Sequence, residues 1–202
     1  MIGSRAATGE MAPTGASGDE PRRKDLTALM LQACGRRGYR NVRLEELGGD
    51  GGPAAAAGCF EDEAECFASG YASEGERLRR LVAATGRLAA GRREALEAVL
   101  TELSRLIAER PAVARSLLTE VHVAGGRALE ERARLLADLA RTIDDAYRED
   151  ASTPPPPGAA MFMVEVIEAA ALRAAVDGDA AILTTAIPDL AQMLEELYAR
   201  IG

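Results

Sequence analysis

Apolar side chains recur at spacings of three and four residues along most of the chain from Pro21 onward, and this spacing constrains the fold more than any other feature. It is the period of a helix with one buried face, whereas strands alternate every second residue. Aromatic residues, which favour strands, make up only 3% of the 202 residues, and there is no Trp. The 20 glycines crowd into a few stretches that can end helices. We therefore expect an all-α fold of about nine helices.

The first third of the chain is divided into short predicted elements. Residues 1–20 are rich in Gly, Ala, Ser and Thr, so they are predicted to form a disordered tail. A first helix follows, with Leu26, Leu29, Met30 and Ala33 on one face. Asn41 can cap a second, short helix in the sequence NVRLEEL. Pro53 and the alanines at 54–57 predict a third helix of under two turns, ended by Gly58.

The remaining predicted helices are longer and end in a proline-rich linker and two apolar helices. The pattern gives helices over about 60–87, 94–110, 112–121, 127–148, 159–177 and 187–201. Four consecutive prolines at 154–157 cannot lie inside a helix and predict the linker. The last two helices are apolar on most faces and must be covered on most faces. We therefore expect a homodimer formed through them, at about 159–177 and 187–201.

Charge is distributed unevenly along the chain. The net charge of -8 argues against a general electrostatic affinity for nucleic acid. Residues 1–43 nevertheless carry eight basic residues against four acids, whereas residues 44–76 hold nine acids and no base. A basic edge therefore lies next to an acidic one.

The three cysteines and the N-terminal sequence indicate the cellular compartment in which the protein is expected. An odd number of cysteines without a CxxC pair fits a reducing compartment. No signal-peptide pattern and no uncharged run of membrane-spanning length is present, so we expect a soluble, cytoplasmic protein. Cys59 and Cys66 are seven residues apart, too far along one helix for a disulfide.

Two segments carry a resemblance to a known family. LMLQACGRRGYRNVRLEEL at residues 29–47 and FEDEAECF at residues 60–67 resemble the first helix, Gly-aromatic turn and fourth-helix opening of the TetR-like bacterial regulators, and residues 108–147 look like that family's ligand domain. The resemblance implies a helix-turn-helix domain at 21–66, in which a third helix enters the DNA major groove. It also implies a ligand-binding and dimerisation domain at 67–202, in which ligand binding changes the spacing of the two DNA-reading heads, whose half-sites on DNA must lie about 34 Å apart.

The DNA contacts that the resemblance implies are weakened in this sequence. Alanines at 54–57 replace the polar side chains of the reading helix, and alanine cannot donate the paired hydrogen bonds that distinguish bases. Acids at 61–65 repel phosphate and are interpreted as a helix cap. The candidate DNA-binding residues are Arg22, Arg23, Lys24, Arg43, Pro53, Ala54 and Ala55. The predicted function is a ligand-responsive DNA-binding transcriptional regulator of repressor type. The alternative is a regulator-derived homodimer that has lost sequence-specific DNA binding and binds a small molecule or a protein.

The candidate effector-binding residues lie in the predicted ligand domain: Leu81, Leu103, His122, Phe162 and Glu165. A small-molecule pocket places few polar groups in apolar walls, and His122 is the single histidine. Glu165 and Glu168 interrupt an apolar helix, so they are expected to pair across the dimer or with Arg173, or else to recognise a cationic effector. No catalytic motif is present, and we expect no enzymatic activity, metal or cofactor.

Overall fold

The computed structural model describes residues 19–48, 58–89, 91–150 and 156–199, and all regular structure in these ranges is helical. The all-α prediction is therefore confirmed for this part of the chain. The long helices are α1 (Asp19–Arg37), α3 (Glu63–Leu88), α4 (Arg92–Glu109), α7 (Gly126–Asp150), α8 (Ala159–Asp177) and α9 (Ala181–Ala199). The short elements are the 3-10 turns η1 (Tyr39–Asn41) and η2 (Leu44–Leu47), α5 (Pro111–Arg115), the π-helical η4 (Ser116–Glu120) and α6 (Val121–Ala124).

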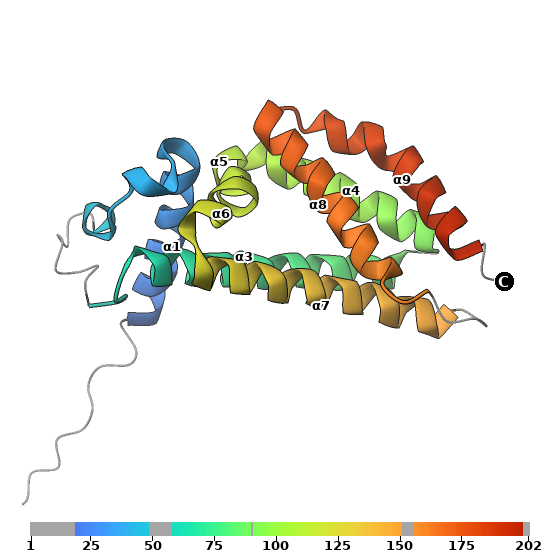
Figure 1. The fold of residues 1–202 in the computed structure, drawn as a ribbon, viewed down its shortest axis with the longest axis horizontal. Coiled ribbons are helices and arrows are strands. Elements are labelled where there is room, and N and C mark those ends of the chain that lie inside the picture. The colour runs from blue at the N-terminus through green and yellow to red at the C-terminus, as the bar shows by residue number, and fades with distance from the viewer. Residues whose placement is uncertain (1–18, 49–57, 90, 151–155, 200–202) are drawn as a thin grey trace, which may run out of the picture.

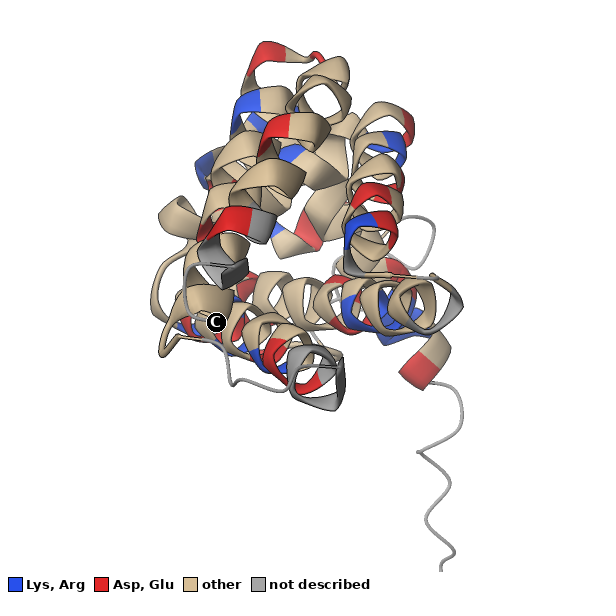
Figure 2. Ribbon diagram, turned by 90° about the vertical axis from the view of Figure 1, so that its right-hand side faces the viewer, with Lys and Arg blue, Asp and Glu red and all other residues tan. Residues whose placement is uncertain are grey.

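The two longest helices, α3 and α7, lie side by side and point in the same direction (Figure 1). α1 packs near the start of α3, α4 and α8 cover the other part of the pair, and α9 packs on α4 and α8. α5, η4 and α6 lie between these two regions (Figure 1). Seen from the end at which the C-terminus lies, charged residues occupy mainly the outer sides of the helices (Figure 2).

The N-terminal region has its own buried core. Met30, Leu31 and Cys34 of α1 are fully buried against Phe67 and its neighbours on α3. Tyr39 meets Phe67 edge to face, with ring centroids 5.4 Å apart. This arrangement is favourable for aromatic pairs and fixes the Gly-Tyr turn after α1 on the start of α3.

The acidic run before α3 is a helix cap, as the sequence predicted. The Asp62 carboxylate accepts a hydrogen bond of 2.7 Å from the Glu65 backbone N–H. The Glu65 carboxylate reaches back to the Glu61 N–H, also at 2.7 Å. These two bonds satisfy backbone donors that the first turn of a helix leaves free.

The α1 helix touches α5 with almost no space between the two backbones. A Cβ atom built on Gly35 would lie 1.7 Å from the Ala112 carbonyl oxygen, so only glycine fits. Two hydrogen bonds close the same seam: the Ser116 hydroxyl donates to the Leu31 carbonyl at 2.5 Å, and the Tyr39 N–H donates to Glu120 at 2.8 Å. The N-terminal helices are thus fixed directly to the α5–η4 segment.

A second core joins α4, α8 and α9. Leu100, Met163 and Leu183, one from each helix, are fully buried, and Ser104 on α4 donates a hydrogen bond of 2.7 Å to the Ala180 carbonyl before α9. Small residues on α8, including Ala171 and Ala174, let these helices approach closely.

Three sequence expectations need correction or fall outside the described part. The predicted short α-helix at 41–47 is replaced by the end of the 3-10 turn η1 at Asn41 and by the 3-10 turn η2 at Leu44–Leu47. The last helix begins at Ala181, six residues before the predicted start, because the Asp179 side chain accepts the Ala181 N–H at 2.9 Å and the helix continues through Pro188. The predicted third helix at 53–58 lies mostly outside the described residues.

None of the described helices combines the length and apolar character needed to cross a membrane. Cys34, Cys59 and Cys66 are all buried free cysteines. Burial raises the pKa of the Cys34 and Cys66 thiols to about 12, so both stay protonated and unreactive at neutral pH.

Candidate functional site

A cavity of about 860 Å³ lies between α3, α4, α7 and α8. This volume is within the range of roughly 300–1,000 Å³ that is usual for small-molecule sites. Each helix contributes apolar side chains to the wall, and these include Leu78, Val82, Val99, Leu106, Leu139 and Ile167. The amphipathic spacing of the four helices therefore creates an apolar interior that the protein's own side chains do not fill.

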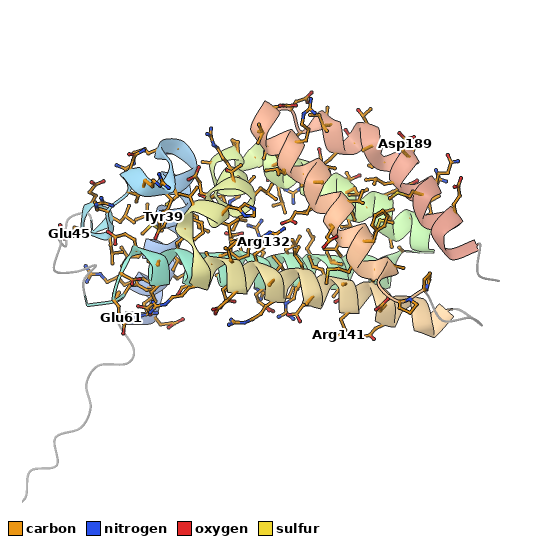
Figure 3. All side chains as sticks on the ribbon, in the orientation of Figure 1. Tyr39, Glu45, Glu61, Arg132, Arg141 and Asp189 are labelled. Atoms are coloured by element: carbon orange, nitrogen blue, oxygen red, sulfur yellow. The ribbon has the colours of Figure 1, made fainter. Side chains whose placement is uncertain are left out.

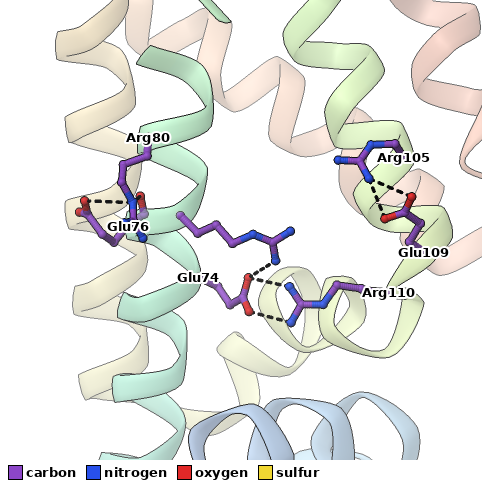
Figure 4. A network of polar contacts seen from close by, with 7 residues as sticks. Glu74, Glu76, Arg80, Arg105, Glu109 and Arg110 are labelled. Atoms are coloured by element: carbon purple, nitrogen blue, oxygen red, sulfur yellow. Dashed lines mark hydrogen bonds and ion pairs between the residues drawn. The ribbon is translucent and has the colours of Figure 1, made fainter. Parts of the chain in front are cut away.

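One group of charged residues is built into this apolar wall, at the end of the cavity next to α5. Arg110, between α4 and α5, holds the Glu74 carboxylate through two hydrogen bonds of 3.0 and 2.7 Å. Arg77, one turn along α3, contacts the same carboxylate at 3.3 Å, while Figure 4 shows how Arg110 and Glu74 face each other. All three side chains line the cavity. Two guanidinium groups thus share one carboxylate.

A second ion pair crosses from α7 to α8 beside the cavity. Arg132 points inward, unlike Arg141 on the same helix (Figure 3), and binds both carboxylate oxygens of Glu168, with an Nε to Oε1 distance of 2.7 Å. Tyr71 and Glu168 line the cavity. Burial raises the pKa of the Tyr71 phenol, and the charge of Glu168 adds to this while Arg132 opposes it. The phenol is therefore a neutral hydrogen-bond donor.

The structure places one of the five predicted effector residues in the cavity wall. Leu103 lines the cavity, whereas Leu81, His122, Phe162 and Glu165 are not among its lining residues. His122 is exposed because α6 buries the preceding residue, Val121.

The same one-residue offset explains the placements on α8 and α3. On α8 the lining residues are Met163, Val164, Ile167, Glu168 and Ala171, so Phe162 and Glu165 point outward. On α3 the lining residues Leu78 and Val82 are four apart, and Leu81 is turned by about 100° from Val82. Glu168 pairs with Arg132, and Arg173 pairs with Asp177, so the expected pairing of Glu168 with Arg173 is wrong.

Three of the predicted DNA-binding residues, Arg22, Lys24 and Arg43, are exposed on or next to the N-terminal helices. Arg23 is held differently: its guanidinium lies 4.1 Å above the Phe60 ring, donates to the Cys59 carbonyl, and contacts Glu65 at 3.5 Å. Arg23 therefore fastens α1 to the segment before α3. Pro53, Ala54 and Ala55 lie outside the described residues.

Sequence reasoning missed the residues that give this cavity its polar character, Glu74, Arg77, Arg110 and Arg132. The i, i+3 spacing of Glu74 and Arg77 on a long helix was visible in the sequence. However, Arg110 and Glu74 are 36 residues apart, and so are Arg132 and Glu168, so no local pattern brings either pair together.

The fold is that of an all-helical protein in which a small N-terminal helical region is fixed to a larger cavity-forming bundle. A solved structure with this fold is described as "Structural analysis of fatty acid degradation regulator FadR from Bacillus halodurans", with a TM-score of 0.68 and 12% identity, covering 86% of this chain and 94% of that chain. No protein-family model matches the sequence, and no curated protein matches it.

Proposed function

We propose that the chain is a cytoplasmic, ligand-responsive transcriptional regulator of the TetR-like type, acting as a repressor. The observation that carries the proposal is the direct contact between the cavity-forming bundle and the N-terminal helices. Arg110 lies in the cavity wall, and two residues later Ala112 touches Gly35 of α1. A ligand in the cavity can therefore change the position of the helices that would meet DNA. The similarity in fold to a structure named as a regulator is consistent with this.

The DNA-facing part of the proposal assigns residues 21–66 to the helix-turn-helix domain and residues 67–202 to effector binding and dimerisation. Arg22, Lys24 and Arg43 would hold phosphates, which positions a protein on DNA without reading its sequence. Arg23 is left out of this set because its guanidinium is already engaged.

Binding to DNA is tested by fluorescence anisotropy of the whole protein with duplexes from upstream of its own gene and random duplex as competitor, at two salt concentrations. We expect saturable binding to one fragment. Arg22→Glu with Lys24→Glu should weaken it at least tenfold and lower the salt slope by about two, since each phosphate contact contributes about one. Arg141→Glu, a reversal on the exposed face of α7, should leave the affinity unchanged.

The alternative is a homodimer of the same origin that no longer reads DNA. It is favoured by the acids at the start of α3, where Glu61 and Asp62 are exposed and pair with Arg127 at 3.6 Å. Binding that is absent, or equal for random duplex and lost at moderate salt, would establish this alternative and end the repressor proposal.

A homodimer through α8 and α9 is part of the proposal. Phe162 and Val176 on α8 are 49% and 61% exposed, and Ala169 is exposed midway between them. A spacing of seven residues places these three side chains in one stripe, which is typical of a helix that packs against a partner helix. Phe162 is thus reassigned from the effector site to the subunit contact.

The dimer is tested by sedimentation equilibrium. The wild-type protein should sediment as a dimer. Phe162→Glu with Val176→Glu should raise the dissociation constant roughly a hundredfold or more, because each subunit would then bury two negative charges next to those of its partner. The control is Leu129→Glu, which adds a charge at an exposed leucine on α7. A monomeric wild-type protein, or equal effects of the two changes, would contradict the assignment.

A further inference from the structure

Two groups of paired charges lie at the cavity, and they differ in their balance of charge. Arg132 and Glu168 neutralise each other one to one. At the α5 end, Glu74 is the carboxylate of both Arg110 and Arg77, so this corner carries one positive charge in excess. Asp145, the third acid in the wall, belongs to the C-terminal part of α7, whose end lies on the other side of the bundle from α5 (Figure 1).

The geometry of this corner suits an acidic group from outside the chain. Arg110 presents both Nη atoms to one carboxylate, which is the arrangement that gives arginine its preference for carboxylate and phosphate oxygens. The Glu74 side chain is 20% exposed and that of Arg110 is 30% exposed, so the pair can be reached from the cavity. Apolar walls begin one turn farther along α3, at Leu78 and Val82.

We propose that the effector is an anionic amphiphile, an acid with an elongated apolar tail, and that Glu74 occupies the place of its acidic group on Arg110. The acidic group of the ligand replaces Glu74 as the partner of Arg110, and Glu74 remains paired with Arg77. The apolar tail of the ligand lies along the apolar wall. This inference rests on the proposed function in that it names the ligand of the proposed effector site. The proposed effector is therefore an anion, whereas Glu165 and Glu168 had suggested a cationic effector.

Exchange at Arg110 has a direct route to the N-terminal helices. Arg110 is the residue at which α4 ends and α5 begins, and its backbone N–H caps α4 by donating to the Leu106 carbonyl at 2.9 Å. Ala112, in the first turn of α5, contacts Gly35 without spare room. A change in the direction of the Arg110 side chain therefore acts on the start of α5. There the backbones of α5 and α1 are in contact, so α1 has no room to stay in place if α5 shifts towards it. Glu74 is accordingly a positioning residue as well as a competitor of the acid.

The experiment is isothermal titration calorimetry of the whole protein with three probes of equal tail, dodecanoate, dodecan-1-ol and dodecylammonium, below the concentrations at which they form micelles. Dodecanoate should bind most tightly and dodecylammonium most weakly. Glu74→Gln keeps the size of the side chain and one acceptor oxygen but removes its charge and its second acceptor, so it should tighten dodecanoate binding roughly tenfold. Binding of dodecan-1-ol should change by less than about twofold.

Two further variants separate this effect from a loss of structure. Glu76→Gln removes a carboxylate two residues away on α3, where it pairs with Arg79 and, as Figure 4 shows, with Arg80, and should alter no affinity. Arg110→Gln should abolish the preference for the acid over the alcohol while the alcohol still binds, which shows that the cavity persists. Unfolding is monitored by circular dichroism.

Equal binding of acid and alcohol, a preference for the ammonium probe, no binding of any probe, or no effect of Glu74→Gln would each overturn the inference. None of these results depends on DNA. If dodecanoate binds as expected but no duplex does, the ligand assignment holds and the regulator proposal fails. If a duplex binds specifically but the acid is not preferred, the opposite is true.

Discussion

Replacing Gly35 by alanine is expected to lower the free energy of unfolding by about 2 kcal/mol or more. The new Cβ would lie 1.7 Å from the Ala112 carbonyl oxygen and 2.9 Å from the Ala112 Cα, and both are backbone atoms that cannot rotate away. Forcing extra atoms into a packed core costs about 1–3 kcal/mol and sometimes more. Alanine stabilises a helix interior by at most about 1 kcal/mol relative to glycine. The clash therefore outweighs this gain, and the free energy of unfolding falls.

The matched control is Gly86→Ala on α3. Gly86 is also helical, in the last turn of α3, but a Cβ atom there would meet nothing within 4 Å. This change should therefore stabilise the protein by about 0.5–1 kcal/mol. Urea unfolding followed by circular dichroism measures both. If the two variants shift the midpoint in the same direction, α1 and α5 do not pack as the structure has them.

The Gly35 contact also illustrates which parts of the fold could be predicted from the sequence. The helices themselves follow from local patterns: the apolar spacing of three and four residues gave the ranges of α3, α4 and α7 to within a few residues. The cap at Asp62 was readable in the same way, because its partner Glu65 is three residues away. By contrast, glycines were expected to end helices, but Gly35 lies inside α1, where the neighbouring Ala112 backbone leaves no room for a side chain.

The candidate site was less predictable for the same reason. Periodicity shows which side of a helix is apolar, but it does not distinguish the side that faces a cavity from the side that faces a partner. Phe162 and Met163 are adjacent and equally apolar, yet one is exposed and the other is fully buried. The charged residues of the wall were missed because Glu74 and Arg110 come from different helices. From the sequence alone, each of these charged residues could equally be a solvent-exposed residue on a helix rich in ion pairs.

Replacing Arg132 by methionine is expected to cost about 2–3 kcal/mol of stability. Arg132 and Glu168 are only 26% and 18% exposed, and the pair links α7 to α8 at the cavity. Methionine keeps much of the apolar volume of the arginine stem but leaves the Glu168 carboxylate without its partner in an apolar wall. Breaking a fully buried pair in this way costs about 3–5 kcal/mol, and the residual exposure of these side chains lowers that figure.

Two further variants show whether the loss comes from the stranded charge or from packing. Arg141→Met on the same helix breaks an exposed pair with Asp138 and should change stability by less than about 0.5 kcal/mol (Figure 3). Adding Glu168→Leu to Arg132→Met removes the unpaired carboxylate and should bring stability back to within about 1 kcal/mol of the wild type. If the double variant is as unstable as the single one, the loss of stability comes from packing between α7 and α8 and not from the unpaired carboxylate. If it recovers, the ion pair mainly keeps a charge satisfied beside the cavity.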